Sequence, residues 1–454
     1  MPTPIRNFVR SLGLDAYVVG GAVRDELLGL PHADEDFLVP GVDHAGLRAA
    51  LEPHGRVEDM EVHGQLVGVR LHPRAREIRA LAPAGIEITP PRAERTTGPG
   101  HRDFEIVSGP HIGIEQDMAR RDFTINAIAL RLADGTLADP FGGLQDLGSR
   151  TLRTVSPTSF HDDPLRLVRG LRFVSQLGFD LSDETITQMR LEAPGLAEVS
   201  AERLGGGIAA DGMGELSKLL LGREPAKALV LARDTGVLVR VMPELAPCIG
   251  YTLASERQPR PLDEHIFTVV QATADAGSQL DVRLAALLHD VGKPDADATD
   301  ESHATVGSRL AAGALRRLRY PTRTQQTVTR IIRAHSFSLD GTIDGLFARR
   351  FLAAHGEELA FALVELKAAD LAAKSVPATE LESLAALRTQ LDHERRSAHR
   401  VQDLVVTGDD LREIGFDEGP ALGQALRTLL DEVVDEPARN EREWLLVRAA
   451  KERL

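Results

Sequence analysis

The sequence predicts an α+β protein in which the strands lie in the first third of the chain and the remainder is mostly helical. Three observations support this fold class. A buried apolar run at residues 16–19 leads through two glycines into a helical pattern, which is typical of a strand–turn–helix unit. Short extended segments follow between residues 65 and 106. From Leu165 onward, apolar residues recur mainly at helical spacing.

The length and composition bound the number of domains and the compartment. A chain of 454 residues exceeds what one hydrophobic core organises, so we expect three or four structural units. The single cysteine, Cys248, excludes internal disulfides, and the first residues lack the apolar core of a signal peptide. No stretch approaches 18 uninterrupted apolar residues. We therefore expect a cytoplasmic protein without a membrane partner.

The charge of the chain limits how it contacts nucleic acid. A formal net charge of −15 argues against indiscriminate coating of nucleic acid, although a local basic surface can still hold a phosphate backbone. The first lysine is Lys218, so phosphate contacts in the first half fall to arginines or backbone amides. Biased codon usage explains the preference for arginine equally well.

The turn after the first predicted strand carries Gly20 and Gly21, whose backbone amides can approach a phosphate. Arg24 follows on the predicted helix. Two carboxylates, Asp34 and Asp36, come a short loop later. On a strand, residues i and i+2 face the same side, so both can reach one pair of divalent cations. A polar surface turn is the alternative interpretation.

The carboxylates at positions 34 and 36 predict a metal-dependent nucleotide transfer site. Hard oxygen ligands next to a triphosphate favour Mg²⁺. Two such ions, roughly 3.5–4 Å apart, activate an attacking hydroxyl and stabilise leaving pyrophosphate. Residues 90–102 are rich in proline and glycine, and we interpret them as a mobile loop over this site without regular structure. A disordered insertion is the alternative.

Two further segments supply candidate nucleotide-binding residues. Arg120 and Arg121 can hold a triphosphate, and Asp122 can accept a hydrogen bond from a ribose hydroxyl. An ordinary surface ion cluster is the alternative for this segment. Asp163 and Arg166 lie on one face of a predicted helix, where an aspartate accepts from the exocyclic amine of cytosine or adenine and an arginine donates to the adjacent ring nitrogen.

This helix offers two interpretations of Asp163. As a base-reading residue it would select CTP and ATP together with Arg166, without a nucleic-acid template. As the residue before Pro164 it would also serve as a helix N-cap, and both roles cannot use the same oxygen. Arg169 and Arg172 continue the same helix face every three residues.

In this order, the motifs GGAVRD, DED, RRDFTINA, DPFGGLQDL and DDPLRLVRGLRF resemble the class II tRNA nucleotidyltransferase and bacterial poly(A) polymerase family. The resemblance implies a head with a small mixed sheet and helices, followed by a largely helical neck, body and tail. It implies metal binding by Asp34 and Asp36. The nucleotide-binding positions that it implies are Gly20, Gly21, Arg24, Arg120, Arg121, Asp122, Asn126, Asp163, Arg166, Arg169 and Arg172.

A second group of histidines and aspartates follows in the helical part. Such side chains are suitable ligands for first-row metals. The segments LLHDVGKP and KAADLAAK resemble the HD phosphohydrolase superfamily. The resemblance implies one metal on His265, His289, Asp290 and Asp370, with His303 and His335 available for a second ion or a phosphate. We expect a divalent transition metal of unknown identity, and structural buried histidines are the alternative.

The sequence is expected to divide into four domains. We expect a nucleotidyltransferase head at residues 1–150, a neck and body at 151–255, an HD domain at 256–400 and a helical tail at 401–454. Residues 205–214 hold five glycines, so we expect a helix break there. The arginine-rich residues 316–333 are either an RNA contact or a solvated helix face.

These expectations combine into an enzyme that adds CMP and AMP to the 3′ end of tRNA from CTP and ATP, with a fused HD phosphohydrolase domain. The expected partners are the tRNA 3′ end and the two nucleotides, and no oligomeric state is predicted. The alternatives are a partial enzyme that adds only CC or only A, a poly(A) polymerase, an HD hydrolase with a nucleotide-binding first half, and a noncatalytic RNA-binding protein.

Overall fold

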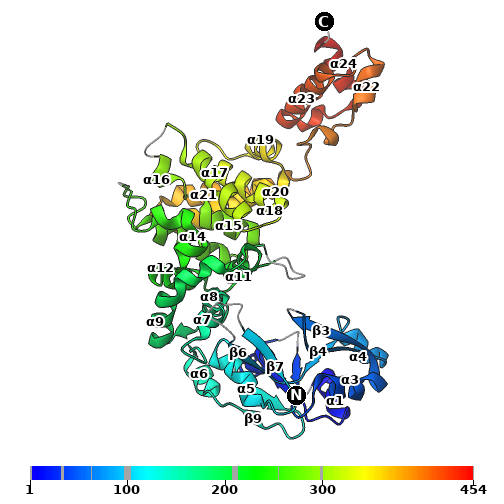
Figure 1. The fold of residues 1–454 in the computed structure, drawn as a ribbon. Helices are drawn as coiled ribbons and strands as arrows, with labels where there is room; N and C mark the ends of the chain where they lie inside the picture. Colours follow the sequence, from blue (N-terminus) through cyan, green and yellow to red (C-terminus); the bar gives the residue numbers. More distant parts are fainter. Residues whose placement is uncertain are drawn as a thin grey trace. The chain divides into compact units, whose positions relative to one another are not determined.

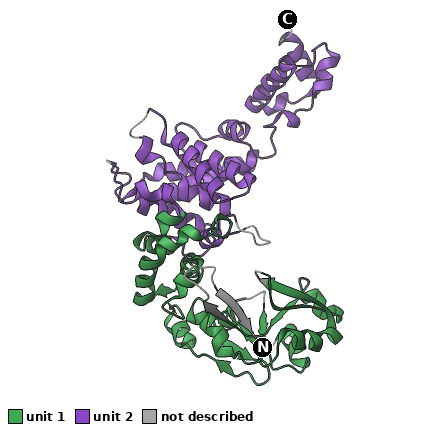
Figure 2. Ribbon diagram, viewed as in Figure 1, with its two compact units in different colours: residues 1–204, 227–241 green, residues 205–226, 242–454 purple. Residues whose placement is uncertain are grey.

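The computed structural model describes residues 3–31, 35–62, 64–96, 104–206, 213–253, 255–296 and 300–452. The chain forms two compact units (Figure 2). The first contains Met1–Leu204 and Lys227–Val241, and the second contains Gly205–Ala226 and Met242–Leu454. Within the described residues, every helix is too short or too polar to serve as a membrane span.

A mixed sheet, to which the described residues contribute seven strands, forms the centre of the first unit (Figure 1). In spatial order the strands are β3 (Gly55–Val62), β4 (Gln65–Pro73), β5 (Ile86–Thr89), β2 (Asp36–Leu38), β1 (Tyr17–Val19), β8 (Ala129–Arg131) and β9 (Leu137–Ala138). Strands β2 and β5 are parallel, whereas the other neighbouring strands are antiparallel. The mixed sheet expected for the head is therefore confirmed.

Apolar side chains make β1 and β2 the central strands of this sheet. Val18, Val19, Phe37 and Leu38 are each at most 3% exposed. The register pairs Val19 with Asp36, so the aspartate lies beside the turn that follows β1. Helices surround the sheet; in chain order they are α1 (Pro4–Ser11), α2 (Gly21–Leu27), α3 (His44–Leu51), α4 (Arg76–Leu81), α5 (Ile114–Ala119) and α6 (Gly143–Ser149).

Strand β6 (Arg92–Thr96) corrects one expectation. It pairs antiparallel with β7 (Phe104–Ser108) in a separate two-stranded sheet. The prediction that residues 90–102 lack regular structure is therefore wrong for residues 92–96. The partner segment, FEIVS, has a high strand propensity, and pairing with it holds β6 extended although the composition of β6 does not require a strand. Residues 97–103 lie outside the described residues.

Helix α8 (Leu165–Leu177) carries the predicted base-reading face. Its buried residues include Leu165, Val168 and Leu171, so the arginines that alternate with them face away from the core. The helix ends at Gly178, whose φ of 70° is the left-handed conformation that favours glycine. The remaining elements of the first unit are α7 (Ser159–Asp162), α9 (Asp183–Glu192), α10 (Ala201–Leu204), α13 (Val237–Val241), β10 (Thr151–Leu152) and β11 (Asp180–Leu181).

The glycine-rich segment interrupts the helices as expected. Helix α10 ends at Leu204 and α11 (Glu215–Leu220) begins after ten intervening residues, of which residues 207–212 lie outside the described residues. Helix α12 (Pro225–Asp234) spans the boundary between the two units.

All regular secondary-structure elements described in the second unit are helices. Its longer helices are α14 (Leu262–Asp275), α15 (Leu280–Leu288), α17 (His303–Arg317), α18 (Thr322–Ala334), α19 (Gly345–His355), α20 (Glu357–Ala372) and α21 (Ala378–Glu394); α16 (Lys293–Ala296) is a single turn. The packing of α14, α15, α18 and α20 against one another brings distant parts of the sequence together.

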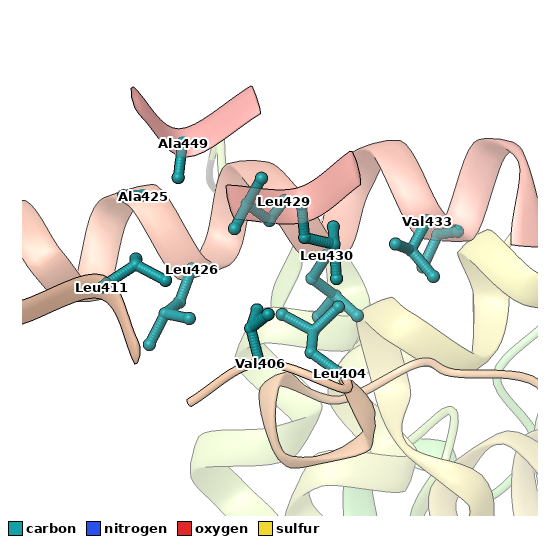
Figure 3. Packing of buried hydrophobic residues seen from close by; sticks show 11 residues of the cluster. Leu404, Val406, Leu411, Ala425, Leu426, Leu429, Leu430, Val433 and Ala449 are labelled. Atoms are coloured by element: carbon teal, nitrogen blue, oxygen red, sulfur yellow. The ribbon is translucent and has the colours of Figure 1, made fainter. Parts of the chain in front are cut away.

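The C-terminal segment forms a small helical core of its own (Figure 3). It contains α22 (Gly408–Glu413), α23 (Pro420–Asp435) and α24 (Arg442–Glu452). Leu426, Leu429 and Leu430 of α23 are buried in this core, whereas Leu422 is partly buried against it. The apolar spacing seen in the sequence therefore marks the packed face of α23.

Candidate functional site

A polar pocket in the first unit gathers the nucleotide-binding residues that the sequence predicts. Its volume is about 620 Å³. Its lining residues are Gly20, Gly21, Arg24, Asp36, Arg92, Arg120, Arg121, Asp122, Asn126, Asp163, Arg166, Arg169, Arg172, Phe173, Gln176 and Arg203. All eleven predicted nucleotide-binding residues are among them, together with Asp36. Asp34, the other predicted metal ligand, lies outside the described residues.

The turn at Gly20 requires glycine for two reasons. Its φ is 73°, a conformation that other residues rarely adopt. A Cβ atom there would lie 2.7 Å from Nη1 of Arg121. The glycine therefore allows a predicted phosphate-binding arginine to approach the backbone at the start of α2.

A chain of hydrogen bonds fixes Asp122 at the floor of the pocket. Arg24 donates from Nη1 to Oδ1 of Asn126 at 2.8 Å, and Nδ2 of Asn126 donates to Oδ1 of Asp122 at 2.9 Å. Arg169 donates to Oδ2 of Asp122 from Nε at 2.9 Å and from Nη2 at 2.6 Å. The amide of Phe123 donates to Oδ1 as well. Asp122 thus aligns Arg169 and, through Asn126, Arg24.

The ionisation of Asp122 follows from these contacts. Burial by itself would raise the pKa of its carboxyl group. The guanidinium of Arg169 and the hydrogen bonds from Asn126 and Phe123 outweigh burial and lower the pKa to about 2. The carboxylate is therefore charged at neutral pH. A ribose hydroxyl that reaches it has to share an oxygen that already accepts two hydrogen bonds, and this contact stays a prediction.

Asp117 positions the two arginines that follow α5. It is fully buried, and its Oδ1 lies 3.2 Å from Nη2 of Arg120 while its Oδ2 lies 3.1 Å from Nη2 of Arg121. The amide of Arg92 also donates to Oδ1 at 3.2 Å. Burial favours a higher pKa for Asp117, but Arg120 and Arg121 outweigh it and lower the pKa. The spacing of i+3 and i+4 was the sequence signal for this role.

Asp163 divides its two oxygens between two partners. Oδ1 accepts a hydrogen bond from the amide of Leu165 at 3.1 Å, and Oδ2 accepts one from Nη2 of Arg203 at 3.3 Å. The local turn therefore occupies one oxygen and leaves the other toward the pocket. Arg166 is anchored separately, because its Nη2 donates to the carbonyl of Arg120 at 2.7 Å and its Nη1 donates to Oγ of Ser159 at 3.2 Å.

Glu35 points away from the pocket and binds α1. Its Oε1 accepts from Nε of Arg6 at 2.6 Å, and its Oε2 accepts from the hydroxyl of Thr3 at 2.8 Å. Arg6 is only 2% exposed and also pairs with Glu26. The alternation along β2 then directs Asp36 toward the pocket.

In the second unit, five helical segments bring the six predicted HD residues together. His265 lies on α14, His289 and Asp290 follow α15, His303 begins α17, His335 follows α18, and Asp370 lies on α20. Two groups of three share Asp290, namely His265, His289 and Asp290, and Asp290, His303 and His335.

Asp290 directs one oxygen to each group. Its Oδ2 lies 3.2 Å from Nε2 of His289 and 3.5 Å from Nε2 of His265. Its Oδ1 lies 3.7 Å from Nε2 of His303 and 3.8 Å from Nε2 of His335. Asp290 could therefore contribute one carboxylate oxygen to each of two cation sites. Asp370 completes the first group, with Oδ1 at 3.1 Å from Nε2 of His265.

The histidine tautomers suit metal binding. Nδ1 of His289 lies 2.8 Å from the carbonyl of Ala286, and Nδ1 of His335 lies 2.6 Å from that of Ile332. When Nδ1–H donates to a carbonyl, Nε2 carries the lone pair. Nε2 of His265 and Nε2 of His289 are buried and have no hydrogen-bond partner within the described ranges. A buried polar atom without a partner costs free energy, and a cation bound to Nε2 would offset that cost.

Burial and charge also shift the pKa values in this cluster. Burial lowers the pKa of His335 to about 4, with help from neighbouring His289. Burial likewise favours a lower pKa for His289, but the carboxylates of Asp290 and Asp370 outweigh it and raise the pKa to about 9, so a cation that binds Nε2 would have to displace its proton. Both carboxylates have lowered pKa values despite their burial, because histidines and lysines surround them.

Comparison with known proteins identifies three segments. Residues 16–153 match the poly A polymerase head domain, residues 262–375 match the HD domain, and residues 178–249 match the probable RNA and SrmB-binding site of polymerase A. The multifunctional CCA protein of Azoarcus sp. (strain BH72) is 37% identical over 328 residues, which are 70% of this chain and 73% of that protein. This chain belongs to the CCA-adding enzyme family.

Further relatives of this CCA-family chain agree. The multifunctional CCA protein of Neisseria gonorrhoeae (strain NCCP11945) is 36% identical over 71% of this chain and 74% of that protein. The CCA-adding enzyme of Bacillus stearothermophilus, solved in complex with CTP, has a TM-score of 0.69 and 26% identity over 99% of this chain and 97% of that chain. The Thermotoga maritima CCA-adding enzyme shares the fold, with a TM-score of 0.60 and 20% identity over 99% and 94%.

Sequence reasoning missed four residues that line the pocket of this CCA-family member. They are Arg92, Phe173, Gln176 and Arg203. The ring of Phe173 lies beneath two guanidinium groups, at 5.0 Å from Cζ of Arg24 and 4.4 Å from Cζ of Arg172. The helical spacing of Arg169, Phe173 and Gln176 was a signal for two of them, whereas nothing local marked Arg92 or Arg203.

Proposed function

We propose that this protein adds CMP and AMP to the 3′ end of tRNA without a nucleic-acid template, with CTP and ATP as nucleotide donors. The observation that carries the proposal is that Asp163 and Arg166 line the same pocket as Asp36 and the arginines around Asp117 and Asp122. One cavity then holds a base-reading pair, a carboxylate for metal and cations for phosphates. The names of the relatives, multifunctional CCA proteins, support CCA addition, and the structurally similar CCA-adding enzyme of Thermotoga maritima was solved in complex with tRNA.

We assign Mg²⁺ to Asp36 and its neighbour Asp34, because Asp36 offers carboxylate oxygen to a pocket lined by phosphate-binding groups, and such hard ligands suit this ion. When bound, a pair of these ions lowers the barrier by activating the terminal ribose hydroxyl and neutralising the leaving pyrophosphate. Arg120 and Arg121 hold the triphosphate, and Asp117 keeps them in position before it arrives. This is catalysis by orientation and electrostatics, without a covalent intermediate.

Base selection falls to Asp163 and Arg166. The carboxylate accepts from the exocyclic amine that cytosine and adenine share, and the guanidinium donates to the adjacent ring nitrogen. Uracil and guanine present the opposite pattern and leave both groups unpaired, which disfavours them. Arg166 is held by Arg120 and Ser159, so little ordering is required when the base binds.

The test is gel-resolved extension of two transcripts with Mg²⁺ and CTP, ATP or both. One transcript is a tRNA that lacks CCA, and the other ends in CC. The proposal expects CCA on the first and a single A on the second. Long A tails would identify a poly(A) polymerase, and products restricted to CC or to the final A would identify a partial enzyme. No extension of either transcript would refute the proposal.

We also propose a second activity, metal-dependent hydrolysis of phosphate esters in the HD domain. The two ligand groups that share Asp290 favour it, and His265, His289 and Asp370 would complete the first site. When bound, the divalent cations supply an activated water. Metal content after dialysis against Mn²⁺, Co²⁺ or Ni²⁺ tests the site, and Asp290→Asn is expected to abolish both binding and hydrolysis.

We further propose four domains with the boundaries predicted from the sequence, at residues 1–150, 151–255, 256–400 and 401–454. The matches at residues 16–153 and 262–375 support the head and the HD domain. The separate core of α22, α23 and α24 supports a distinct tail.

A further inference from the structure

A cleft of about 510 Å³ adjoins the HD cluster within the second unit. It shares Lys293, Lys367, Asp370 and Lys374 with a smaller cavity that reaches His303 and His335. The cleft is therefore continuous with the second ligand group. Phe337 lines both cavities, whereas Gln258 lines the larger cleft.

The composition of the chain makes the lysines of this cleft unusual. Only six of its 53 basic residues are lysines, and three of the six line this cleft. Lysine is therefore concentrated in this cleft, although arginine is the main basic residue in the rest of the chain. An ammonium group is a compact point charge with three donors, which suits a single phosphoryl oxygen, whereas the planar fork of arginine demands more room.

Two of the lysines pair with the carboxylates of the cluster. Nζ of Lys293 lies 2.6 Å from Oδ2 of Asp290. Nζ of Lys374 lies 2.7 Å from both carboxylate oxygens of Asp370 and donates a hydrogen bond to Oδ2. Oδ2 of Asp290 and Oδ1 of Asp370 are also the oxygens nearest to His289 and His265, respectively. A divalent cation that binds them takes over their charge, and the two ammonium groups then face the cleft without a full counter-charge.

The third lysine and a buried amide point to a ligand. Nζ of Lys367 donates to the carbonyl of Phe337 at 3.3 Å and lies 5.3 Å from its ring, so two of its three N–H groups have no acceptor among the residues described. Gln258 is 3% exposed, and its Oε1 accepts from Lys293 at 3.0 Å. Nε2 of Gln258 is buried and has no partner in the described part of the chain.

We propose that this cleft is a phosphoryl-binding subsite, in which Lys367, Lys374 and Gln258 hold oxygens of a phosphomonoester beside the HD metal centre. All three supply N–H donors, and an unpaired buried amide donor is costly unless an acceptor fills it. A phosphomonoester carries up to two negative charges and three acceptor oxygens, which matches these donors. The inference rests on the proposed HD activity, because it assigns the substrate side of that site.

Calorimetric titration of the full chain tests the subsite apart from catalysis. Inorganic phosphate and adenosine 3′-monophosphate are titrated into protein loaded with Mn²⁺ and into metal-free protein. The variants are Lys367→Met and Gln258→Leu, and Lys451→Met is the matched control because Lys451 is exposed on α24. We expect Kd for both anions to rise at least about tenfold in the first two variants and to stay unchanged in the control.

Mn²⁺ titration without phosphate tests the proposed HD metal site separately from the phosphoryl-binding subsite. Lys367→Met and Gln258→Leu are expected to bind Mn²⁺ as the unaltered protein does, since neither side chain is a proposed ligand. If Mn²⁺ lowers the Kd of an anion by a given factor, thermodynamic linkage requires that anion to lower the Kd of Mn²⁺ by the same factor. If the unaltered protein binds no Mn²⁺, the proposed HD activity fails, and the anion titrations of metal-free protein still decide the subsite.

Three results would overturn the subsite. The first is unchanged anion affinity in both variants while Mn²⁺ binding is intact. The second is an equal loss in Lys451→Met, which would indicate a general charge effect. The third is binding of inorganic phosphate without adenosine 3′-monophosphate, which would make the cleft a site for the free anion. Thermal unfolding of each variant checks that it is folded. Lys367 and Gln258 lie on different segments of the chain, so a local folding defect in one variant would not affect the other.

Discussion

Opposite charges in the nucleotide pocket hold one another in position before a substrate binds. Asp117 fixes Arg120 and Arg121, and Asp122 fixes Arg169. Arginine side chains are long and lose much rotamer freedom when ordered. Because the buried carboxylates order them during folding, less of that cost falls on nucleotide binding.

Asp122→Asn tests this arrangement through the pH dependence of stability. The pKa of Asp122 is about 2 in the folded chain against about 3.9 for an aspartate in an unfolded chain, so its ionisation contributes about 2 kcal/mol at neutral pH. A lowered pKa contributes fully above about pH 4, and the contribution disappears as pH falls to about 2. We expect the variant to be destabilised most near pH 6 and progressively less below pH 4.

Hydrogen exchange of α8 peptides in both proteins measures this difference at each pH. Fluorescence of the single tryptophan is unsuitable, because Trp444 lies on α24 in the second unit and Asp122 lies in the first. Asp180→Asn is the control, because Asp180 is exposed and pairs with Lys227 at the surface. A loss of protection in Asp122→Asn that stays constant from pH 6 to pH 3 would contradict the assigned ionisation.

Arg203→Met tests whether Arg203 orients the base-reading carboxylate. Without its donor, Oδ2 of Asp163 is free to rotate, so we expect kcat/KM for CTP and ATP to fall by up to about tenfold, and discrimination against UTP to fall as well. Single-nucleotide addition to a CC-ended tRNA and to a tRNA that lacks CCA measures both. Arg153→Met is the control, since Arg153 is equally exposed and pairs with Glu184 outside the pocket. Equal kinetics in the two variants would leave Arg203 without this role.

At the scale of elements, close packing sets the position of α8. A Cβ atom at Gly170 would lie 2.8 Å from Cζ of Phe123, whose buried ring also contacts Phe160 and Phe173. Gly170→Ala therefore displaces α8. Overpacking of this kind costs about 1–3 kcal/mol, more than the gain of up to about 1 kcal/mol from replacing a helical glycine. We expect lower stability and a fall in kcat/KM, because Arg166 and Arg169 shift together.

Gly148→Ala is the matched control for this substitution. Gly148 is also helical, on α6, and no atom lies within 4 Å of a Cβ built there. This substitution is expected to be neutral or slightly stabilising. Urea unfolding followed by circular dichroism, with the extension assay, compares the two. Equal stability of both variants would show that the ring of Phe123 moves aside freely.

Elements with a local signal were predictable from the sequence, and those that depend on a distant partner were not. The run before Gly20 and the apolar spacing of α8 and α23 are local patterns, and each led to the correct element. Strand β6 exists because β7 pairs with it, which the composition of residues 90–102 hides. Among site residues, Asp117 precedes its arginines by a helical spacing, whereas Arg203 and Gln258 reach their sites only through tertiary packing.

At the scale of the whole molecule, an acidic chain concentrates basic groups in two cavities. The net charge is −15, yet eight arginines line the described part of the nucleotide pocket and three of the six lysines line the HD cleft. These local basic groups attract anions to both cavities despite the negative net charge. The pocket lies in the first unit and the cleft in the second, and each is built from residues of its own unit.

This separation predicts that the two activities are lost independently. Asp36→Asn removes a carboxylate that lines the pocket, and we expect at least about a hundredfold fall in nucleotide addition with unchanged Mn²⁺ binding at the HD cluster. Asp290→Asn removes the shared ligand of the cluster, and we expect the converse. Extension of a tRNA that lacks CCA and calorimetric Mn²⁺ titration are measured on both variants. Loss of both activities in either variant would mean that the sites are coupled through the fold, because no side chain serves both within the described residues.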